Sequence, residues 1–309
     1  MTTVGDMLYQ MGGVPVSAEF TTGSVFFVDS TTGSNSNDGK SPDTALATID
    51  AAIGKCTADK GDIIYAMPKH VETISAANGI ALDVAGVSVI GMGRGLRRPV
   101  VTFDTAAAAT FAISGASCMV KNIALSANFA DITSPVIVSG KDCILENVSF
   151  VETATSMNFL SCIATSAVAN AADGLSVIRC ERISVDAAAL AFISILAHQD
   201  RVKIIGNYDS QLSAADVGHF IIMGAFNLTN AKIVGNICVN AGDNNAQTVG
   251  DFMTGSSTAS SGVVAYNLMG SLDTTTELFD TATLEFHHFE NYHTGTVAKS
   301  GTILPAIET

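Results

Sequence analysis

The chain has 309 residues, 48% of them hydrophobic and 14% charged, which is enough for one large domain or two ordinary ones with a sizeable buried core. Its 15 Lys and Arg against 29 Asp and Glu give a net charge of −14, which excludes nucleic acid and anionic membrane as partners because both would repel it. No stretch reaches the roughly 18 uninterrupted apolar residues of a membrane span, and the first residues lack the basic start and apolar core of a secretory signal.

Residues 1–24 do not share the pattern of the rest of the chain. They read MTTVGDMLYQMGGVPVSAEFTTGS, in which glycines separate isolated apolar side chains. One interpretation is a strand packed on its own domain, and the other is an arm that lies in a groove of a partner. We expect the arm, with these candidate partner-binding residues: Met7, Leu8, Tyr9, Met11 and Val14.

The next segment, FFVDSTTGSNSNDGKSP at 26–42, places a polar loop directly after a short apolar strand. If Gly39 were the turn glycine of an EF-hand, serines would hold the first two ligand positions, Asp38 the third and Ala45 the twelfth. The bidentate carboxylate of an EF-hand is therefore missing. Asn, Asp, Ser and Gly in this density predict a long turn, with a looser ion site as the alternative.

An amphipathic helix is predicted at 48–56, because Ile49, Ile53 and Cys56 fall on one helical face. The segment GDIIYAMP at 61–68 then reads as a strand. Further on, GRGLRRP at 93–99 contributes three cations, Arg94, Arg97 and Arg98. It is either an exposed loop between strands or a docking point for an acidic neighbour, and both interpretations stay open.

From here to the end, a short motif recurs: two strand residues, a variable residue, an Asn and usually an apolar residue. It appears as MVKNI, ILENV, VIRCE, IIGNY, IVGNI, VAYNL and HFENY, with 24 to 33 residues between successive copies. VIGMG at 89–93 is an earlier copy with Gly91 in the asparagine position. The recurring positions form one expected column: Asn122, Asn147, Cys180, Asn207, Asn236, Asn267 and Asn291.

A spacing that recurs but varies is typical of stacked coils joined by loops of different length. Asn tolerates a left-handed bend, Gly91 suits the same bend, and stacked Asn amides bond to one another. We therefore predict an all-β fold, a right-handed parallel β-helix (solenoid) of about eight coils. A β-sandwich is the alternative, but its turn signals usually come every 8–12 residues or so.

The predicted organisation has four parts. Residues 1–24 form the arm, 25–60 a capping strand, loop and helix, 61–293 the β-helix, and 294–309 a C-terminal tail. A β-helix exposes unpaired strand edges at its ends, so we interpret 25–60 as a lid over the first coil.

The sequence contains no convincing catalytic or metal-binding set, and we expect no cofactor. In EFHHFENYH, His287 and His288 are neighbours on a strand and so face opposite sides, with His287 outward. The six cysteines lack CxxC or zinc spacing and are expected to be small buried side chains. Asp142 and Glu146 come nearest to the acidic pair of a hydrolase, and pairing with surface cations explains them better.

The run FFVDSTTGSNSNDGKSPDTALATIDAAI followed by GDIIYAMPKHVETI resembles the N-terminal entry of phage-encoded right-handed parallel β-helix proteins with a pectate-lyase-like fold. LDVAGVSVIGMGRGLRRP and LTNAKIVGNICV extend the resemblance over most of the chain. The chain departs from some relatives in having Pro68-Lys69 where they have Pro-Gly. The resemblance implies a virion component of a tailed phage.

We expect a non-enzymatic capsid decoration (cement) protein that binds the major capsid protein on the head surface as a homotrimer, after synthesis in the host bacterial cytoplasm. The alternative is a tail-spike or receptor-binding protein that binds or cleaves host-surface polysaccharide. A stand-alone polysaccharide lyase is a third hypothesis, and nothing in the sequence suggests its secretion.

Overall fold

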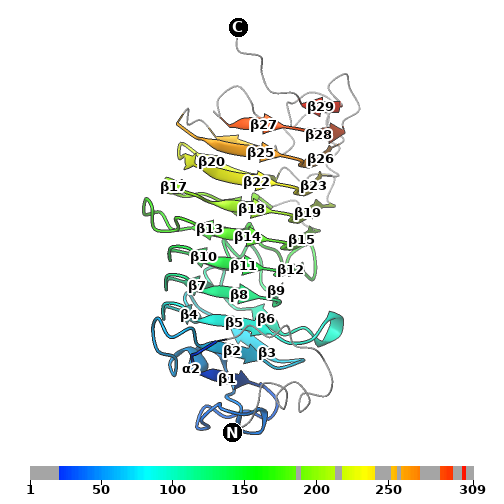
Figure 1. The fold of residues 1–309 in the computed structure, drawn as a ribbon. Coiled ribbons are helices and arrows are strands. Elements are labelled where there is room, and N and C mark those ends of the chain that lie inside the picture. Colours follow the sequence, from blue (N-terminus) through cyan, green and yellow to red (C-terminus); the bar gives the residue numbers. More distant parts are fainter. Residues whose placement is uncertain are drawn as a thin grey trace.

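The computed structural model describes residues 21–185, 189–212, 218–240, 252–255, 259–271, 286–294 and 301–303. They build three β-sheets that run side by side along one axis (Figure 1). Among these residues no helix is long and apolar enough to cross a membrane. The helical pieces are α2 (Ile49–Ile53) and two 3-10 turns, η1 (Pro42–Thr44) and η2 (Gly95–Arg97).

The first sheet, sheet A, contains ten strands, in this order: β1 (Val25–Val28), β2 (Ile63–Ala66), β5 (Ser88–Gly91), β8 (Met119–Lys121), β11 (Ile144–Glu146), β14 (Ser176–Ile178), β18 (Lys203–Ile205), β22 (Ala231–Val234), β25 (Gly262–Ala265) and β27 (His287–Phe289). Sheet B also contains ten, in this order: β3 (Val71–Ile74), β6 (Val100–Phe103), β9 (Ala124–Ala127), β12 (Ser149–Glu152), β15 (Glu181–Ser184), β19 (Tyr208–Gln211), β23 (Ile237–Asn240), β26 (Leu268–Ser271), β28 (Asn291–Thr294) and β29 (Gly301–Ile303).

Sheet C contains seven strands: β4 (Ile80–Leu82), β7 (Phe111–Ile113), β10 (Val136–Val138), β13 (Ser161–Thr165), β16 (Ala191–Ser194), β20 (His219–Gly224) and β24 (Met253–Gly255). A small fourth sheet pairs β17 (Gln199–Asp200) with β21 (Leu228–Thr229). All pairs between these strands are parallel except that of β28 with β29, which closes the C-terminal end of sheet B.

Each coil passes through sheets A, B and C in turn, and each strand pairs with its equivalent one coil later. In Figure 1 the front strands run left to right while the chain climbs, so the winding is right-handed. The fold is thus the predicted all-β parallel β-helix. The seven strands of sheet C enclose six strand-to-strand steps, so the described residues complete about six turns, slightly fewer than the eight expected.

The inward-facing side chains form continuous columns along the axis. In sheet A one such column is wholly apolar and buried over six coils: Val120, Leu145, Val177, Ile204, Ile233 and Val264. Phenylalanines form a second stack, with ring centroids 4.9–6.0 Å apart: Phe103, Phe159, Phe150, Phe192, Phe220 and Phe252. Burying each such side chain contributes roughly 1.5–3 kcal/mol.

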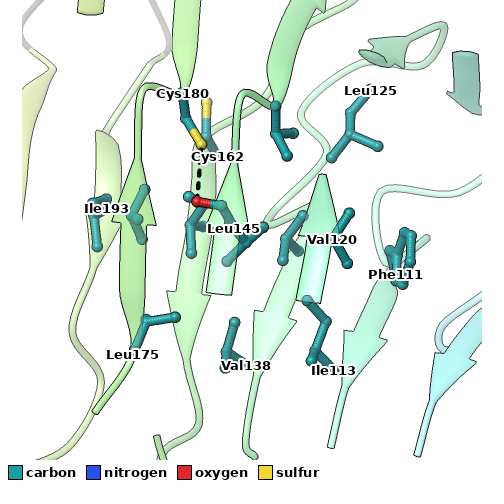
Figure 2. Close-up of a cluster of buried hydrophobic side chains, with 14 of the residues drawn as sticks. Phe111, Ile113, Val120, Leu125, Val138, Leu145, Cys162, Leu175, Cys180 and Ile193 are labelled. Atoms are coloured by element: carbon teal, nitrogen blue, oxygen red, sulfur yellow. Dashed lines mark hydrogen bonds between the residues drawn. The ribbon is translucent and has the colours of Figure 1, made fainter. Parts of the chain in front are cut away.

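The cysteines lie in this core rather than in a reactive site. Five of the six are buried, and all six are free thiols. Burial raises the pKa of the Cys143 and Cys180 thiols to about 12, so they are un-ionised at neutral pH. Figure 2 shows Cys180 among the apolar side chains, with its Sγ 3.6 Å from the carbonyl oxygen of Leu145.

The asparagine motif occupies two neighbouring columns, not the single column predicted. Glu146 pairs with Ile178 and Ser149 with Glu181, so Asn147 stands opposite Arg179, and Cys180 stands one position further along. The outer column is Gly91, Asn122, Asn147, Arg179, Gly206, Gly235, Tyr266 and Glu290. The inner column is Ile123, Val148, Cys180, Asn207, Asn236, Asn267 and Asn291.

The left-handed bend belongs to the outer column. Asn122 and Asn147 take φ 57° and 53°, as predicted for a bend asparagine. In the later coils the residue before the Asn makes the bend, for example Gly235 at φ 69°. Gly91 is needed for a different reason from the predicted one, since a Cβ there would lie 2.1 Å from the carbonyl oxygen of Asn122.

The inner asparagines form a buried ladder through four coils. Asn207, Asn236 and Asn267 each donate Nδ2 to the Oδ1 of the next Asn at 2.9 Å. Each Oδ1 also accepts the backbone N–H of the preceding coil's Asn, as from Asn207 to Asn236 at 2.9 Å. Because the left-handed residue precedes it, the Asn side chain turns inward and joins adjacent coils instead of lying on the surface.

The polar segment at 26–42 covers the free edge of β1. Leu46 N–H bonds to Phe27 O at 2.9 Å, and Phe27 N–H bonds to Gly39 O at 2.8 Å. Asp38 accepts the Thr44 hydroxyl at 2.7 Å and the Lys40 N–H at 3.1 Å. Its carboxylate is therefore engaged by turn donors, which fits a long turn that blocks edge pairing.

Replacing Asn236 by Ala should lower the free energy of unfolding by about 3 kcal/mol, because it leaves buried partners on both neighbouring coils without a hydrogen bond. Urea denaturation followed by circular dichroism measures this. Thr73→Ala, at an exposed position of β3, is the control and should change stability by less than about 0.5 kcal/mol. Equal effects of the two substitutions would contradict a contribution of the asparagine ladder to stability.

Candidate functional site

The two carboxylates nearest to a hydrolase pair are held by separate cations. Asp142 lies 3.4 Å from Nη1 of Arg201. Glu146 lies 3.2 Å from Nζ of Lys121 and is also bonded by Arg179. They precede and end strand β11, respectively, and they do not face one another across a shared site. Ion pairing with surface cations accounts for both, as the sequence predicted.

A second acidic group lies where sheet C meets sheet A. Asp200 accepts the Thr229 hydroxyl at 2.7 Å and Nδ2 of Asn230 at 2.8 Å. These hydrogen bonds, with the nearby Arg201, lower the pKa of Asp200. One coil earlier, Asp173 lies 3.7 Å from Nζ of Lys141. Within the described ranges, no group of three or more His, Cys, Asp or Glu could hold a metal ion.

The three arginines of the 93–99 loop divide into two roles. Arg98 lies against the outer column, where Nε bonds Oδ1 of Asn122 at 3.2 Å and Nη2 bonds Oδ1 of Asn147 at 3.1 Å. Arg94 and Arg97 are exposed, and neither forms an ion pair with another described residue. Between them Leu96 is 99% exposed, so the loop presents an apolar tip with a free cation on either side.

A charged cluster lies inside the β-helix, facing inward from sheet B. Arg182 donates Nε to Asp209 Oδ1 at 2.6 Å and Nη2 to Asp209 Oδ2 at 2.9 Å, and both side chains are fully buried. Gln211 donates Nε2 to the same carboxylate at 3.0 Å. Burial acts to lower the pKa of Arg182, but the charge of Asp209 outweighs it and the pKa is raised.

Glu152 belongs to the same cluster and holds two loops in place. It accepts Val185 N–H at 3.0 Å and Phe159 N–H at 3.3 Å, from the connections that leave sheet B in successive coils. Burial raises the pKa of Glu152, against the opposing charge of Arg182. Arg182 also bonds Ala191 O at 3.3 Å, so the cluster ties sheet B to the start of β16. Its contacts are internal, which makes it structural.

The two histidines of EFHHFENYH face opposite sides, as predicted. His287 is exposed, whereas His288 is buried in the apolar column next to Val264. Among the residues that the structure describes, neither ring nitrogen of His288 has a hydrogen-bond partner. Burial, with a smaller effect from His287, lowers the pKa of His288.

Several exposed large apolar side chains gather around the corner between sheets A and B in the last coils, namely Tyr208, Ile237, Tyr266, Phe289 and Tyr292. On sheet B the outward row consists of Tyr208, Ile237, Leu268 and Tyr292, which we name the B flank. On sheet A the outward row consists of Ile178, Ile205, Val234, Ala265 and Phe289, which we name the A flank. In this row Phe289 is exposed, the first three residues are half-buried and Ala265 is buried. Tyr266 lies on the corner, 53% exposed, and its ring meets that of Phe289 edge to face with centroids 5.6 Å apart.

The flanks were not predicted from the sequence, although the motif carries a signal for them. An apolar residue follows each late Asn, as in NY, NI, NL and NY, and the repeat alone assigns it no face. Since the Asn faces inward there, the next residue must face outward. The candidate arm residues Met7, Leu8, Tyr9, Met11 and Val14 lie outside the described residues.

No protein-family model matches the chain, and no curated protein matches it. Among solved structures, a rhamnogalacturonan lyase matches with 14% identity over 87% of each chain and a TM-score of 0.47. A deglycosylated pectin methylesterase from Aspergillus niger matches with 10% identity over 94% of this chain and 92% of its own, with a TM-score of 0.43. A pectate lyase from Bacillus sp. N165 in complex with trigalacturonate matches with 12% identity, 96% and 90% coverage and a TM-score of 0.36. The fold assignment comes from the strand pairing, and these distant similarities assign no activity.

Replacing Arg182 by Met should destabilise the protein by about 3–5 kcal/mol, because Asp209 and Glu152 would keep buried charge without a cation. Thermal and urea unfolding measure this. Arg201→Met removes two ion pairs of a half-exposed side chain and should cost less than about 1 kcal/mol. Similar losses for the two variants would contradict the account of the buried cluster.

Stability should also fall as the pH drops below the ordinary histidine pKa of 6.5. The reason is that His288 binds a proton at a higher pH in the unfolded chain than in the folded protein. Because the pKa of His288 is lowered in the folded protein, its full contribution to stability is present above pH 6.5. This contribution is lost as the pH falls from 6.5 to the folded-state pKa. His288→Leu should flatten this part of the profile, measured as the unfolding free energy between about pH 5 and 7.5. His287→Gln is the control and should keep the wild-type slope.

Proposed function

We propose that the chain is a non-enzymatic structural protein of a tailed-phage virion, a decoration protein that binds the head surface as a homotrimer. The sequence resemblance supplies the phage context. The observation that carries the contact role is the loop tip formed by Arg94, Leu96 and Arg97, which projects an exposed apolar side chain between two free cations.

Arg94 and Arg97 have no ion-pair partner among the described residues. The chain carries a net charge of −14, and several other surface cations, such as Lys121, Arg179 and Arg201, are paired with carboxylates. Two arginines without partners beside a fully exposed leucine favour docking on an acidic surface with an apolar pocket. The major capsid protein is the proposed owner of that surface. The surface carboxylates that hold Lys121, Arg179 and Arg201 support a role in contact rather than in hydrolysis.

Purified protein added to heads stripped of it should bind saturably, and sedimentation with quantified bound protein measures this. Arg94→Glu/Arg97→Glu should weaken binding at least about tenfold, because two attractive contacts become repulsive. Lys55→Glu/Lys60→Glu is the matched control, since it makes the same change in net charge at two exposed positions in the 25–60 segment. Absence of binding to heads, with recovery on tails, would overturn the decoration role.

A second candidate function is glycan binding at the A/B corner. Four aromatic rings are exposed there, Tyr208, Tyr266, Phe289 and Tyr292, and flat aromatic faces suit the apolar faces of sugar rings. A polysaccharide binding and cleavage assay on purified protein separates this role from the first. Robust turnover of a host-surface glycan would replace the decoration proposal with the tail-spike or lyase alternative.

A further inference from the structure

The A and B flanks differ in character from the same rows earlier in the chain. The B-flank row runs from Val71 and Val100 through Ala124, Ser149 and Glu181, which are small or charged, and it is large and apolar again from Tyr208 onward. The A-flank row starts with Phe27, Tyr65 and Ile90, which are buried, and continues with Lys121 and Glu146, which pair with each other. Along these two rows, the exposed large apolar side chains are therefore found at Val71 and then in the last coils, where they gather at one corner.

The corner between the flanks is shaped for close approach. Gly206 and Gly235 occupy it in two successive coils. A Cβ at Gly235 would meet nothing within 4 Å, and one at Gly206 would meet only the Arg179 side chain, at 3.7 Å. The neighbouring side chains stand beside these glycines, with Ile237 39% and Tyr208 38% exposed. A partner can thus reach the backbone ridge and contact both flanks. Contiguous exposed apolar side chains of this size mark an interaction site.

A pair of lysines borders the A flank. Lys203 and Lys232 are direct neighbours on β18 and β22, and within the described part of the chain neither has a carboxylate partner. Like charges directly opposite on adjacent strands are destabilising. The pair therefore suits a partner that brings negative charge to this edge, which the acidic chain itself, at −14, would do.

From these features we infer that the occupant of the A/B corner is a second copy of this chain, packed alongside with its axis parallel. The rows follow the axis at the strand spacing of about 4.8 Å, so a neighbour with the same repeat matches them coil for coil. The A flank of one copy lies on the B flank of the next. Such a head-to-tail contact closes into a ring. That the ring contains three copies rests on the proposed function, a homotrimer.

The contact is tested by measuring the molar mass of the full chain with size-exclusion chromatography and light scattering at about 1–50 µM. Wild type should run as a closed oligomer. Ile237→Arg and Tyr208→Lys should each shift it to monomer, because each places a charge inside the apolar contact. Val71→Arg, at a 52% exposed position at the far end of the same row, is the matched control and should leave the oligomer intact. Circular dichroism confirms that each variant is folded.

The orientation is tested by co-expressing two differently tagged copies, one with Lys232→Cys on the border of the A flank and the other with Ile237→Cys on the B flank. Mild oxidation should cross-link chains with different tags more than chains with the same tag. A wild-type monomer at every concentration, or an oligomer unchanged by both corner variants, would overturn the inference and leave the corner to a glycan or another protein.

The failure of this inference and that of the proposed function give different results. An oligomer that is sensitive to Ile237→Arg but never binds heads keeps the interface and removes the decoration role. A monomer that still binds heads through Arg94 and Arg97 keeps the binding to the head and removes the interface between copies.

Discussion

The register between successive coils is the constraint on which the rest of this structure depends. Parallel pairing alone does not fix it, because a strand of three or four residues pairs almost equally well when shifted by one position, which would turn its core side chains outward. The buried amides of Asn207, Asn236, Asn267 and Asn291 fix it in the last coils, since each bonds to the equivalent Asn of the next coil. Ile123, Val148 and Cys180 occupy the same inner column earlier, where packing takes over this role.

The outward surface follows from that register. Because the late asparagines face inward, the following residue of each coil faces outward, and these residues form the B flank. Because the bend precedes them, glycine can occupy the corner at Gly206 and Gly235. The same local change that builds the ladder thus creates an exposed apolar corner. The core itself tolerates charge only where it is paired, as Arg182 and Asp209 are.

Much of the fold could be predicted from the sequence, because a recurring motif with variable spacing can be recognised without the structure. The parallel β-helix follows from it. The buried cysteines follow from their scattered spacing, and the opposite faces of His287 and His288 follow from strand alternation. The shift between Asn147 and Asn207 could not be predicted, since MVKNI and IIGNY look alike and only the pairing of Glu146 with Ile178 reveals it. The partners of Arg182 also depend on which inward columns meet across coils.

The proposed contact surfaces are harder to predict from the sequence, for a physical reason. Catalytic residues can be suggested by residue type alone. A contact surface depends on which apolar side chains remain exposed, and only the fold shows which ones they are. The sequence shows the loop around Arg94 as a cluster of cations. It does not show that Leu96 is exposed at the tip, or that Arg98 forms hydrogen bonds with Asn122 and Asn147.

The central claim is that this β-helix works by contact, with copies joined at the A/B corner and anchored on a head by the Arg94–Arg97 loop. Cryo-electron microscopy of decorated heads tests it most directly. The account predicts closed groups of rods on the head lattice, with A/B corners turned toward one another and the Arg94–Arg97 loop against the shell. Isolated rods with solvent-facing corners, or rods found on the tail, would contradict it.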